Sequence, residues 1–351
     1  MPQTIKCPNC GASLVYKEGT DSLVCPYCGT KVPIAGSRQQ TASEQTEAEE
    51  SSSEASQADD GSVHFKCSSC GAELITDAHT AATICPFCGS PAILKSRISG
   101  KNRPQSLIPF RYDKKAAQEE FRKWTRSGFF TPKGFRSSST LDHIEGIYVP
   151  YWMFSFDAHA RMEAKGSLSR SHREGDFLVT ETDHFLLMRE TQADFSRIPA
   201  DASEQMPDDV MDSLEPFNYG EIREFNPSYL SGFMAENSNY EPSALQPRAE
   251  RRADSAIEAQ TRSTFAGFEN VIVVNSQIND KVTDREYSMF PVWVLTYRYR
   301  GKDWKLYLNG QTGRRIGSLP VDPGRVVLCF ILCFFLFFGL SALINLLMLT
   351  L

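Results

Sequence analysis

The stretch CPNCGASLVYKEGTDSLVCPYCG, residues 7–29, places two Cys-x-x-Cys pairs fourteen residues apart. Residues 67–89, CSSCGAELITDAHTAATICPFCG, repeat this arrangement 60 positions later. Each set supplies four thiolates, the number that a closed tetrahedral zinc site requires. The spacing therefore predicts two structural zinc ions, with these ligands: Cys7, Cys10, Cys25, Cys28, Cys67, Cys70, Cys85 and Cys88.

A glycine directly follows every pair: Gly11, Gly29, Gly71 and Gly89. Two sulfurs so close in sequence can hold one ion only if the chain turns back sharply after the second cysteine. Such a turn favours a positive φ, which glycine adopts without steric cost. The glycines therefore support metal binding at all four pairs.

A dithiol redox site is the alternative interpretation of these cysteines. Residues 25–28 spell C-P-Y-C, the active-site sequence of glutaredoxins, and residues 85–88 differ only in the aromatic residue. A glutaredoxin-like site needs one pair at the start of a helix within a βαβ unit. Here each pair has a partner pair and runs into glycine. We therefore expect structural zinc rather than a dithiol or a disulfide.

Residues 5–34 and 65–94 resemble the zinc ribbon of transcription factor IIB, in which a small antiparallel sheet carries two knuckles. The resemblance rests on the cysteine spacing, the glycines and apolar positions such as Leu14 and Leu74. A ribbon of this size has almost no core, so metal binding should supply most of its folding free energy, on the order of 10 kcal/mol. We expect both ribbons to be unfolded without zinc.

Composition divides the rest of the 351-residue chain. Residues 37–62 hold seven acidic residues and one arginine but no Val, Ile, Leu or aromatic residue, which predicts a flexible, disordered linker. The predicted organisation is as follows: zinc ribbon 1 at 1–36, the acidic linker at 37–62, zinc ribbon 2 at 63–98, an α+β domain at 99–320 and a transmembrane helix at 326–351.

One helix is predicted early in the α+β domain, over residues 114–127. Its apolar stripe has helical spacing: Ala117, Phe121 and Trp124. Asp113 suits the N-cap, and Gly128 suits a left-handed residue after the last turn. Farther along, Pro247 is expected in the first turn of a weakly hydrophobic surface helix over Arg248–Arg262.

Segments rich in β-branched and aromatic residues predict strands at 147–154, 176–190, 270–277, 289–298 and 304–309. The predicted fold class is therefore α+β: two small zinc ribbons of four cysteines each, a mostly antiparallel α+β central domain and a C-terminal transmembrane helix.

The last 26 residues, Val326–Leu351, carry no charged side chain. As a helix they would extend about 39 Å, more than the roughly 30 Å hydrocarbon core of a bilayer. A buried core helix is the alternative, but no predicted sheet is large enough to cover a helix that is apolar on all faces. We therefore expect a single-pass membrane anchor. Gly339, Ala342 and Asn345 could pair such helices, so a homo-oligomer is possible.

Two features indicate that the bulk of the chain is cytoplasmic. Arg314, Arg315 and Arg325 precede the apolar segment, and no charged side chain follows it, which is the pattern of the positive-inside rule. Cysteines grouped for metal binding also require a reducing compartment. Met1 leads directly to the first ribbon, without the pattern of a signal peptide.

No arrangement of residues indicates catalysis. The six histidines form no H-E-x-x-H motif and accompany no evident serine or cysteine nucleophile: His64, His79, His143, His159, His172 and His184. No phosphate-binding glycine loop is present in the sequence. We therefore expect a protein that is not an enzyme, although a site in the central domain is a third possibility.

The order of segments resembles a bacterial family of membrane-bound proteins with transcription-factor-IIB-type zinc ribbons. The similarity covers most of residues 63–351 and includes G-I-Y-V-P-Y-W at 146–152 and L-N-G-Q-T-G at 308–313. It implies partners of the SPFH-domain and phage-shock-protein-A types at the membrane. The function expected from it is a non-catalytic, tail-anchored adaptor in an envelope-stress or membrane-organising complex.

A membrane-tethered nucleic-acid-binding or transcription-related protein is the alternative function. Residues 97–126 have a local charge of +6, which fits a solvated face, a contact with anionic lipid or the acidic linker, or nucleic acid. The net charge of −6 and the near-neutral ribbons argue against phosphate binding. We therefore do not expect a nucleic-acid partner.

Overall fold

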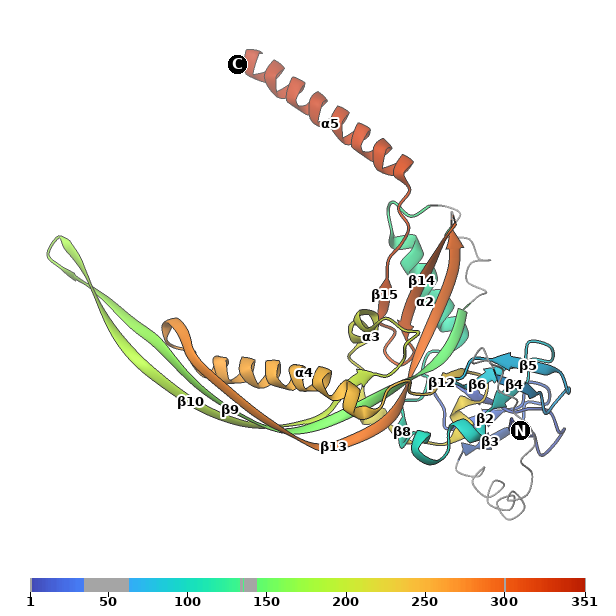
Figure 1. Cartoon of the computed structure of the whole chain (residues 1–351). Helices are drawn as coiled ribbons and strands as arrows, with labels where there is room; N and C mark the ends of the chain where they lie inside the picture. Colours follow the sequence, from blue (N-terminus) through green and yellow to red (C-terminus); the bar gives the residue numbers. More distant parts are fainter. Residues whose placement is uncertain (1, 35–62, 133–134, 136–143, 300, 351) are drawn as a thin grey trace.

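The computed structural model describes residues 2–34, 63–132, 135, 144–299 and 301–350. These residues form a body, a long curved arm that leaves the body, and a straight C-terminal helix (Figure 1). The fold class is the predicted one: α+β, with mostly antiparallel strands, two groups of four cysteines and a C-terminal apolar helix. The predicted linker at 37–62 lies outside the described residues.

Three very long strands build the arm: β9 (Ile144–Glu174), β10 (Phe177–Asp201) and β13 (Glu269–Tyr299). β9 lies between the other two and pairs antiparallel with both. The four strands predicted between residues 147 and 298 fall on these three. β9 and β10 continue well beyond the predicted C-terminal ends, and β13 joins the two segments predicted at 270–277 and 289–298. The strand predicted at 304–309 is confirmed as β14 (Lys302–Asn309).

Small residues explain why the middle of β9 carries a weak sequence signal. Ala158, Ala160 and Ala164 are buried on one face of the strand, whereas His159 and Arg161 between them are exposed. Alanine is depleted in strands, so its alternation with polar residues does not stand out as a β pattern. The small side chains leave room for a helix to pack closely on this face.

That helix is α4 (Pro242–Ser263), which lies in the concave side of the arm (Figure 1). The predicted start at Pro247 is wrong, because Pro242 occupies the first turn, where a missing N–H is tolerated, and Pro247 lies inside the helix. The helix was predicted to lie on the surface, but only one of its faces is exposed. The other face is buried against the arm through Ala249, Ala253 and Ile257.

The body is organised around a mixed sheet into which β9 and β13 continue. Short strands extend this sheet on both sides: β8 (Ser106–Leu107), β11 (Arg223–Glu224), β12 (Met234–Glu236), β14 and β15 (Arg315–Gly317). Helical turns connect them: α3 (Asp208–Leu214), η1 (Lys95–Arg97), η2 (Gly100–Asn102), η5 (Tyr219–Glu221) and η6 (Pro227–Leu230).

The helix α2 (Lys114–Ser127) confirms the predicted one. The Asp113 carboxylate accepts a hydrogen bond from the Ala116 N–H at 2.7 Å, as expected of an N-cap. The prediction for Gly128 is wrong, since its φ is −70°. A Cβ at this position would lie 2.1 Å from Thr131 Oγ1, so close packing and not a left-handed turn requires the glycine.

The first ribbon is packed into the body. Its strands β1 (Val15–Lys17), β2 (Ser22–Val24) and β3 (Lys31–Pro33) form a small separate sheet. Tyr16 is buried in the same core as Phe110 and Trp293 of the body, and its N–H donates to the Ser231 carbonyl at 2.9 Å. We expected this ribbon to have almost no core, but it shares the hydrophobic core of the body.

The second ribbon is divided between two sheets. Its strands β4 (Val63–Lys66) and β5 (Glu73–Thr76) pair with each other. Its strands β6 (Thr80–Ile84) and β7 (Pro91–Ile93) belong to the body sheet, because β6 pairs with β12. The body core and the second metal group are thus connected by continuous backbone hydrogen bonding.

Candidate metal centres

The four Cys-x-x-Cys pairs adopt one common turn. In the first, the Cys7 N–H donates to the Ala12 carbonyl at 2.7 Å, and the Gly11 N–H donates back to the Cys7 carbonyl at 2.9 Å. The other three pairs make the same two bonds. The four glycines after the pairs have φ between 70° and 73°, the left-handed conformation predicted for them.

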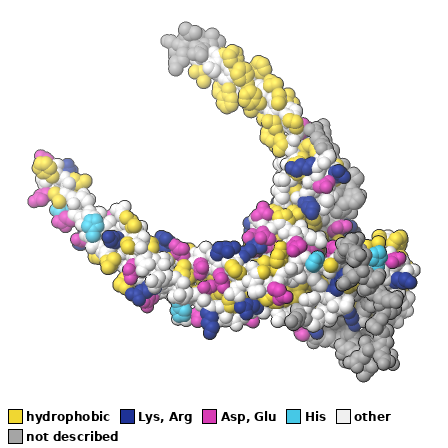
Figure 2. All heavy atoms as spheres, viewed as in Figure 1, with side chains coloured by type: hydrophobic (Ala, Val, Ile, Leu, Met, Phe, Trp, Pro, Cys, Tyr) yellow, Lys and Arg dark blue, Asp and Glu magenta, His cyan; other side chains and the backbone are white. Residues whose placement is uncertain are grey.

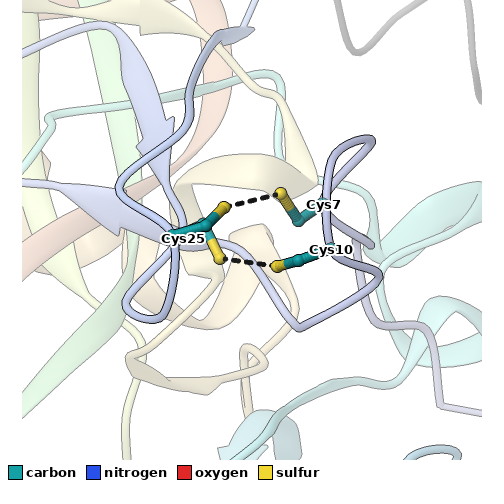
Figure 3. Close-up of side chains that lie close together, drawn as sticks. Cys7, Cys10 and Cys25 are labelled. Atoms are coloured by element: carbon teal, nitrogen blue, oxygen red, sulfur yellow. Dashed lines mark hydrogen bonds between the residues drawn. The ribbon is translucent and has the colours of Figure 1, made fainter.

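The eight predicted ligands form two groups, Cys7/Cys10/Cys25/Cys28 and Cys67/Cys70/Cys85/Cys88, in each of which the sulfurs lie within 4.8 Å of one another. Cys7, Cys10 and Cys25 point toward a common centre (Figure 3). The closest sulfurs of the first group are 3.5 and 3.6 Å apart, and both such pairs of the second group are 3.8 Å apart. All eight are free thiols.

These separations fit a tetrahedral metal site. Four sulfurs at about 2.3 Å from a zinc ion would lie roughly 3.8 Å from one another. A disulfide would need about 2.05 Å between two sulfurs. Each group could therefore hold one metal ion, and no helix begins at either C-P-aromatic-C pair as a dithiol active site would require.

Hydrogen bonds favour the thiolate form at the last cysteine of each group. The Thr30 hydroxyl and N–H lower the pKa of Cys28 to about 6, with the hydroxyl 3.1 Å from the sulfur. The hydroxyl and N–H of Ser90 likewise lower the pKa of Cys88 to about 6. A thiolate is the form that binds a metal.

Crowding of the sulfurs acts in the opposite direction at Cys10. The Ala12 N–H lowers the pKa of this thiol, but the adjacent sulfurs of Cys25 and Cys28 outweigh it and raise the pKa to about 12. Four thiolates this close repel one another unless a cation lies between them. The donor set thus has the chemistry of a metal site.

The structure brings the two metal groups into one unit, which the sequence did not indicate. Gln3 forms an antiparallel bridge with Ile93 of β7. Residues in or beside the knuckles also contact each other: the Lys6 ammonium lies 3.4 Å from Ser69 Oγ, and Ser13 Oγ lies 3.3 Å from Ser90 Oγ. We call this unit, residues 2–34 and 63–94, the metal head.

The described histidines are not gathered into a site. His64 lies 3.3 Å from Glu73, and His159 lies 3.4 Å from Asp157, both near the surface. His143 is outside the described residues. The absence of an enzyme activity stays a prediction. In the basic stretch 97–126, Arg97 has a structural contact: its guanidinium donates hydrogen bonds to the carbonyls of Asp77 and Thr80.

Among the described residues, α5 (Pro323–Thr350) is the helix long and apolar enough to cross a membrane. Its first twenty residues have a mean hydropathy of 2.4 and are not buried by any other part of the chain that the structure describes. Hydrophobic side chains cover its visible face, while charges of both signs are spread along the arm (Figure 2). The helix starts three residues before the predicted 326.

The start of α5 is fixed to the body. The Asp322 N–H donates to the Phe130 carbonyl at 2.9 Å, and the Arg325 guanidinium donates to the Thr131 carbonyl at 2.7 Å. Both acceptors lie in the loop after α2. The metal head lies at the other end of the body from this junction (Figure 1).

These features define an α+β protein with two four-cysteine metal groups and a C-terminal apolar helix. Comparison with known proteins shows where such a chain belongs. It is 39% identical over 325 residues to a protein described as "Uncharacterized protein YdjG" of Bacillus subtilis (strain 168), covering 93% of this chain and 92% of the relative. The chain belongs to the same family as YdjG. No family model matches it, and no solved structure matches it.

Proposed function

We propose that the protein is a non-catalytic, tail-anchored membrane adaptor, whose metal head docks partner proteins at the cytoplasmic face. The observation that carries this proposal is the arrangement of its two ends. An exposed apolar helix is fixed to one end of the body, and the two metal groups form a single head at the other (Figure 1).

Zinc is the metal that we propose for both groups. Four thiolates in tetrahedral separation suit zinc, and a closed four-cysteine set leaves no open position for a substrate. When bound, the two ions would hold the knuckles in place and would take no part in a reaction. The exposed aromatic rings at the knuckles, Tyr27 and Phe87, would then be presented on a rigid frame.

The proposed orientation follows from the sequence around α5. Arg314, Arg315 and Arg325 precede the helix, and a cytoplasmic body would place them on the side where positive charge is retained. Reduced cysteines are also maintained on that side. From this position the head would extend away from the bilayer toward soluble or membrane-associated partners.

The resemblance to membrane-bound zinc-ribbon proteins suggests partners of the SPFH-domain and phage-shock-protein-A types. Under this proposal the protein acts by binding and not by catalysis. It would hold such partners at one site on the membrane in an envelope-stress or membrane-organising complex. Pairing of α5 helices into a homo-oligomer would multiply the number of heads at that site.

Crosslinking in intact membranes, followed by purification in detergent, tests the proposal. The double variant Cys28→Ser/Cys88→Ser removes one ligand from each metal group, and Cys329→Ser, in α5, is the matched control outside both groups. We expect the double variant to lose the crosslinked partners and the control to keep them. An identical partner set in all three proteins would contradict the adaptor function.

A further inference from the structure

A groove of about 800 Å³ lies where three parts of the molecule meet. One wall is β5 of the second ribbon, another is the start of β9 in the body, and the first ribbon contributes Val15 and Glu18. The metal head and the body therefore share this groove, which is not part of either metal group.

Two strand edges face the groove. All four residues of β5, Glu73–Thr76, line it in succession, so the groove follows the edge of the strand and not one of its faces. Within the described residues β5 pairs with β4 only. Since the Cys67 N–H bonds to Ala72, the antiparallel alternation directs the backbone groups of Glu73 and Ile75 away from β4.

The opposite wall has a similar edge. Ile144, Glu145 and Gly146 at the start of β9 also line the groove in succession. Among the described residues, they pair with β13 on one side, whereas the neighbouring β12 reaches only Ile147 and Tyr148. An extended chain placed in the groove would thus find backbone donors and acceptors on both walls.

The side chains around these edges are apolar with an excess of negative charge. Ile75 is 64% exposed and Phe87 is 72% exposed, although both are large apolar residues. The charged residues that line the groove are three carboxylates and one ammonium: Glu18, Glu73, Glu145 and Lys114. A ligand with apolar side chains and positive charge would complement this lining.

We propose that the groove binds an extended segment of a partner protein by strand addition, and that this segment combines apolar residues with lysine or arginine. Strand addition obtains affinity from backbone hydrogen bonds and selectivity from alternate side chains. The inference rests on the proposed adaptor function and names the chemistry of its partner. The carboxylates disfavour a phosphate-bearing ligand and the acidic residues 37–62 of the chain itself.

A selection from a library of short random peptides, with the full-length protein held in lipid nanodiscs, tests the inference. We expect enriched peptides to alternate apolar and basic residues and to bind the wild-type protein in fluorescence polarisation. Enrichment of acidic peptides, or no enrichment, would overturn the proposal.

Substitutions at the edge of β5 locate the binding. Ile75→Pro removes an N–H that faces the groove and leaves the bonds to β4 in place, so we expect about tenfold weaker binding of the enriched peptides. Ile75→Ala keeps that N–H and should weaken binding less. Equal affinities of wild type and Ile75→Pro would exclude strand addition on β5.

Charge reversal provides a second test for the case in which Ile75→Pro fails to fold. Glu145→Lys should weaken binding of the enriched peptides at low salt, and the difference from wild type should disappear at high salt. Glu190→Lys on the arm is the matched control. Retention of metal shows that each variant is folded. Unchanged binding by Glu145→Lys at low salt would contradict the proposed partner chemistry.

The crosslinking experiment separates this inference from the adaptor function. If the groove variants keep all partners and the metal-ligand variants lose them, the adaptor stands and the groove is not its docking site. If both sets lose the same partners, both proposals are supported. If neither set loses any, both are wrong.

Discussion

The two metal ribbons share one cysteine pattern but differ in how they join the rest of the protein. The first ribbon keeps its own three-stranded sheet and meets the body through buried side chains such as Tyr16 and through single backbone hydrogen bonds. The second ribbon gives β6 and β7 to the body sheet. The same four-cysteine arrangement can thus belong either to a packed module or to part of a larger sheet, according to the strands between the cysteines.

This difference concerns where the free energy of metal binding is used. In the first ribbon, metal binding would stabilise the three short strands and the surface that packs on the body. In the second it would also hold the end of a sheet that continues through β12 to β9. We therefore expect loss of the second metal to affect more of the molecule.

The largest effect is expected from ligand substitutions compared between the ribbons. Cys85→Ser should destabilise the protein by several kcal/mol and increase amide hydrogen exchange in β6, β7 and β12, because these strands share one sheet. Cys25→Ser should confine the increase to β1, β2, β3 and their contacts. Hydrogen exchange followed by mass spectrometry measures the increase in each variant. If the increase reached the same strands in both variants, the two ribbons would not differ in how they support the body.

A smaller effect is expected where the first ribbon packs on the body. Gly232 has φ +96°, and a Cβ there would lie 2.4 Å from Val15 Cγ1. Gly232→Ala should therefore cost about 1–3 kcal/mol through overpacking, beyond the cost of the backbone conformation. Gly267→Ala is the control, since its φ is +102° but its Cβ would meet no atom within 4 Å. Equal unfolding free energies for the two variants would show that Val15 of the first ribbon does not pack tightly against Gly232.

A further comparison uses one aspartate in each ribbon. Asp77, at the turn before β6, accepts hydrogen bonds from the His79 N–H, from Thr80 and from the Gln205 side chain of the body. Asp21 in the first ribbon accepts one from the Tyr229 hydroxyl and is 61% exposed. At pH 7 Asp77→Ala should lower the free energy of unfolding by about 1–2 kcal/mol and Asp21→Ala by under about 1 kcal/mol.

The stabilisation by Asp77 should depend on pH. Partial burial would raise the pKa of this carboxyl, but the hydrogen bonds from Thr80, Gln205 and His79 outweigh it and hold the pKa below its usual value. A lowered folded-state pKa gives stability that is present above the unfolded value of about 3.9 and is lost as the pH falls through the folded value. The difference between wild type and Asp77→Ala should therefore shrink in acid, and a difference that grows would contradict this sign.

The smallest effect is expected at the contact between the two ribbons. Ser69→Ala removes the acceptor of the Lys6 ammonium, an exposed contact of 3.4 Å. Its effect on the free energy of unfolding should be within about 0.5 kcal/mol, as for most exposed polar contacts. Chemical denaturation measures it, and a loss above about 2 kcal/mol would show that the ribbons depend on each other far more than their contacts indicate.

The sequence predicted the parts of the molecule that depend on local chemistry. Cysteine spacing and the four glycines identified both metal groups, because the knuckle turn is built within a few residues. Asp113 identified the start of α2 in the same way. The apolar composition of α5 identified the candidate membrane helix without any tertiary information.

The features that the sequence did not predict depend on contacts between distant segments. The length of β9 was missed because its alternating alanines acquire their role only when α4 covers them. The fusion of the second ribbon with the body depends on β12, which follows β6 only after a long intervening stretch of chain. The groove between β5 and β9 is likewise formed by segments that are distant in sequence, so no local motif marks it.

The most direct test of the central claim is the metal content of the full-length protein extracted from membranes, measured by elemental mass spectrometry together with its protein concentration. The two four-cysteine groups predict two zinc ions per chain in the membrane fraction. Protein without zinc, or a full-length protein found only in the soluble fraction, would contradict a metal-built head carried on a membrane helix.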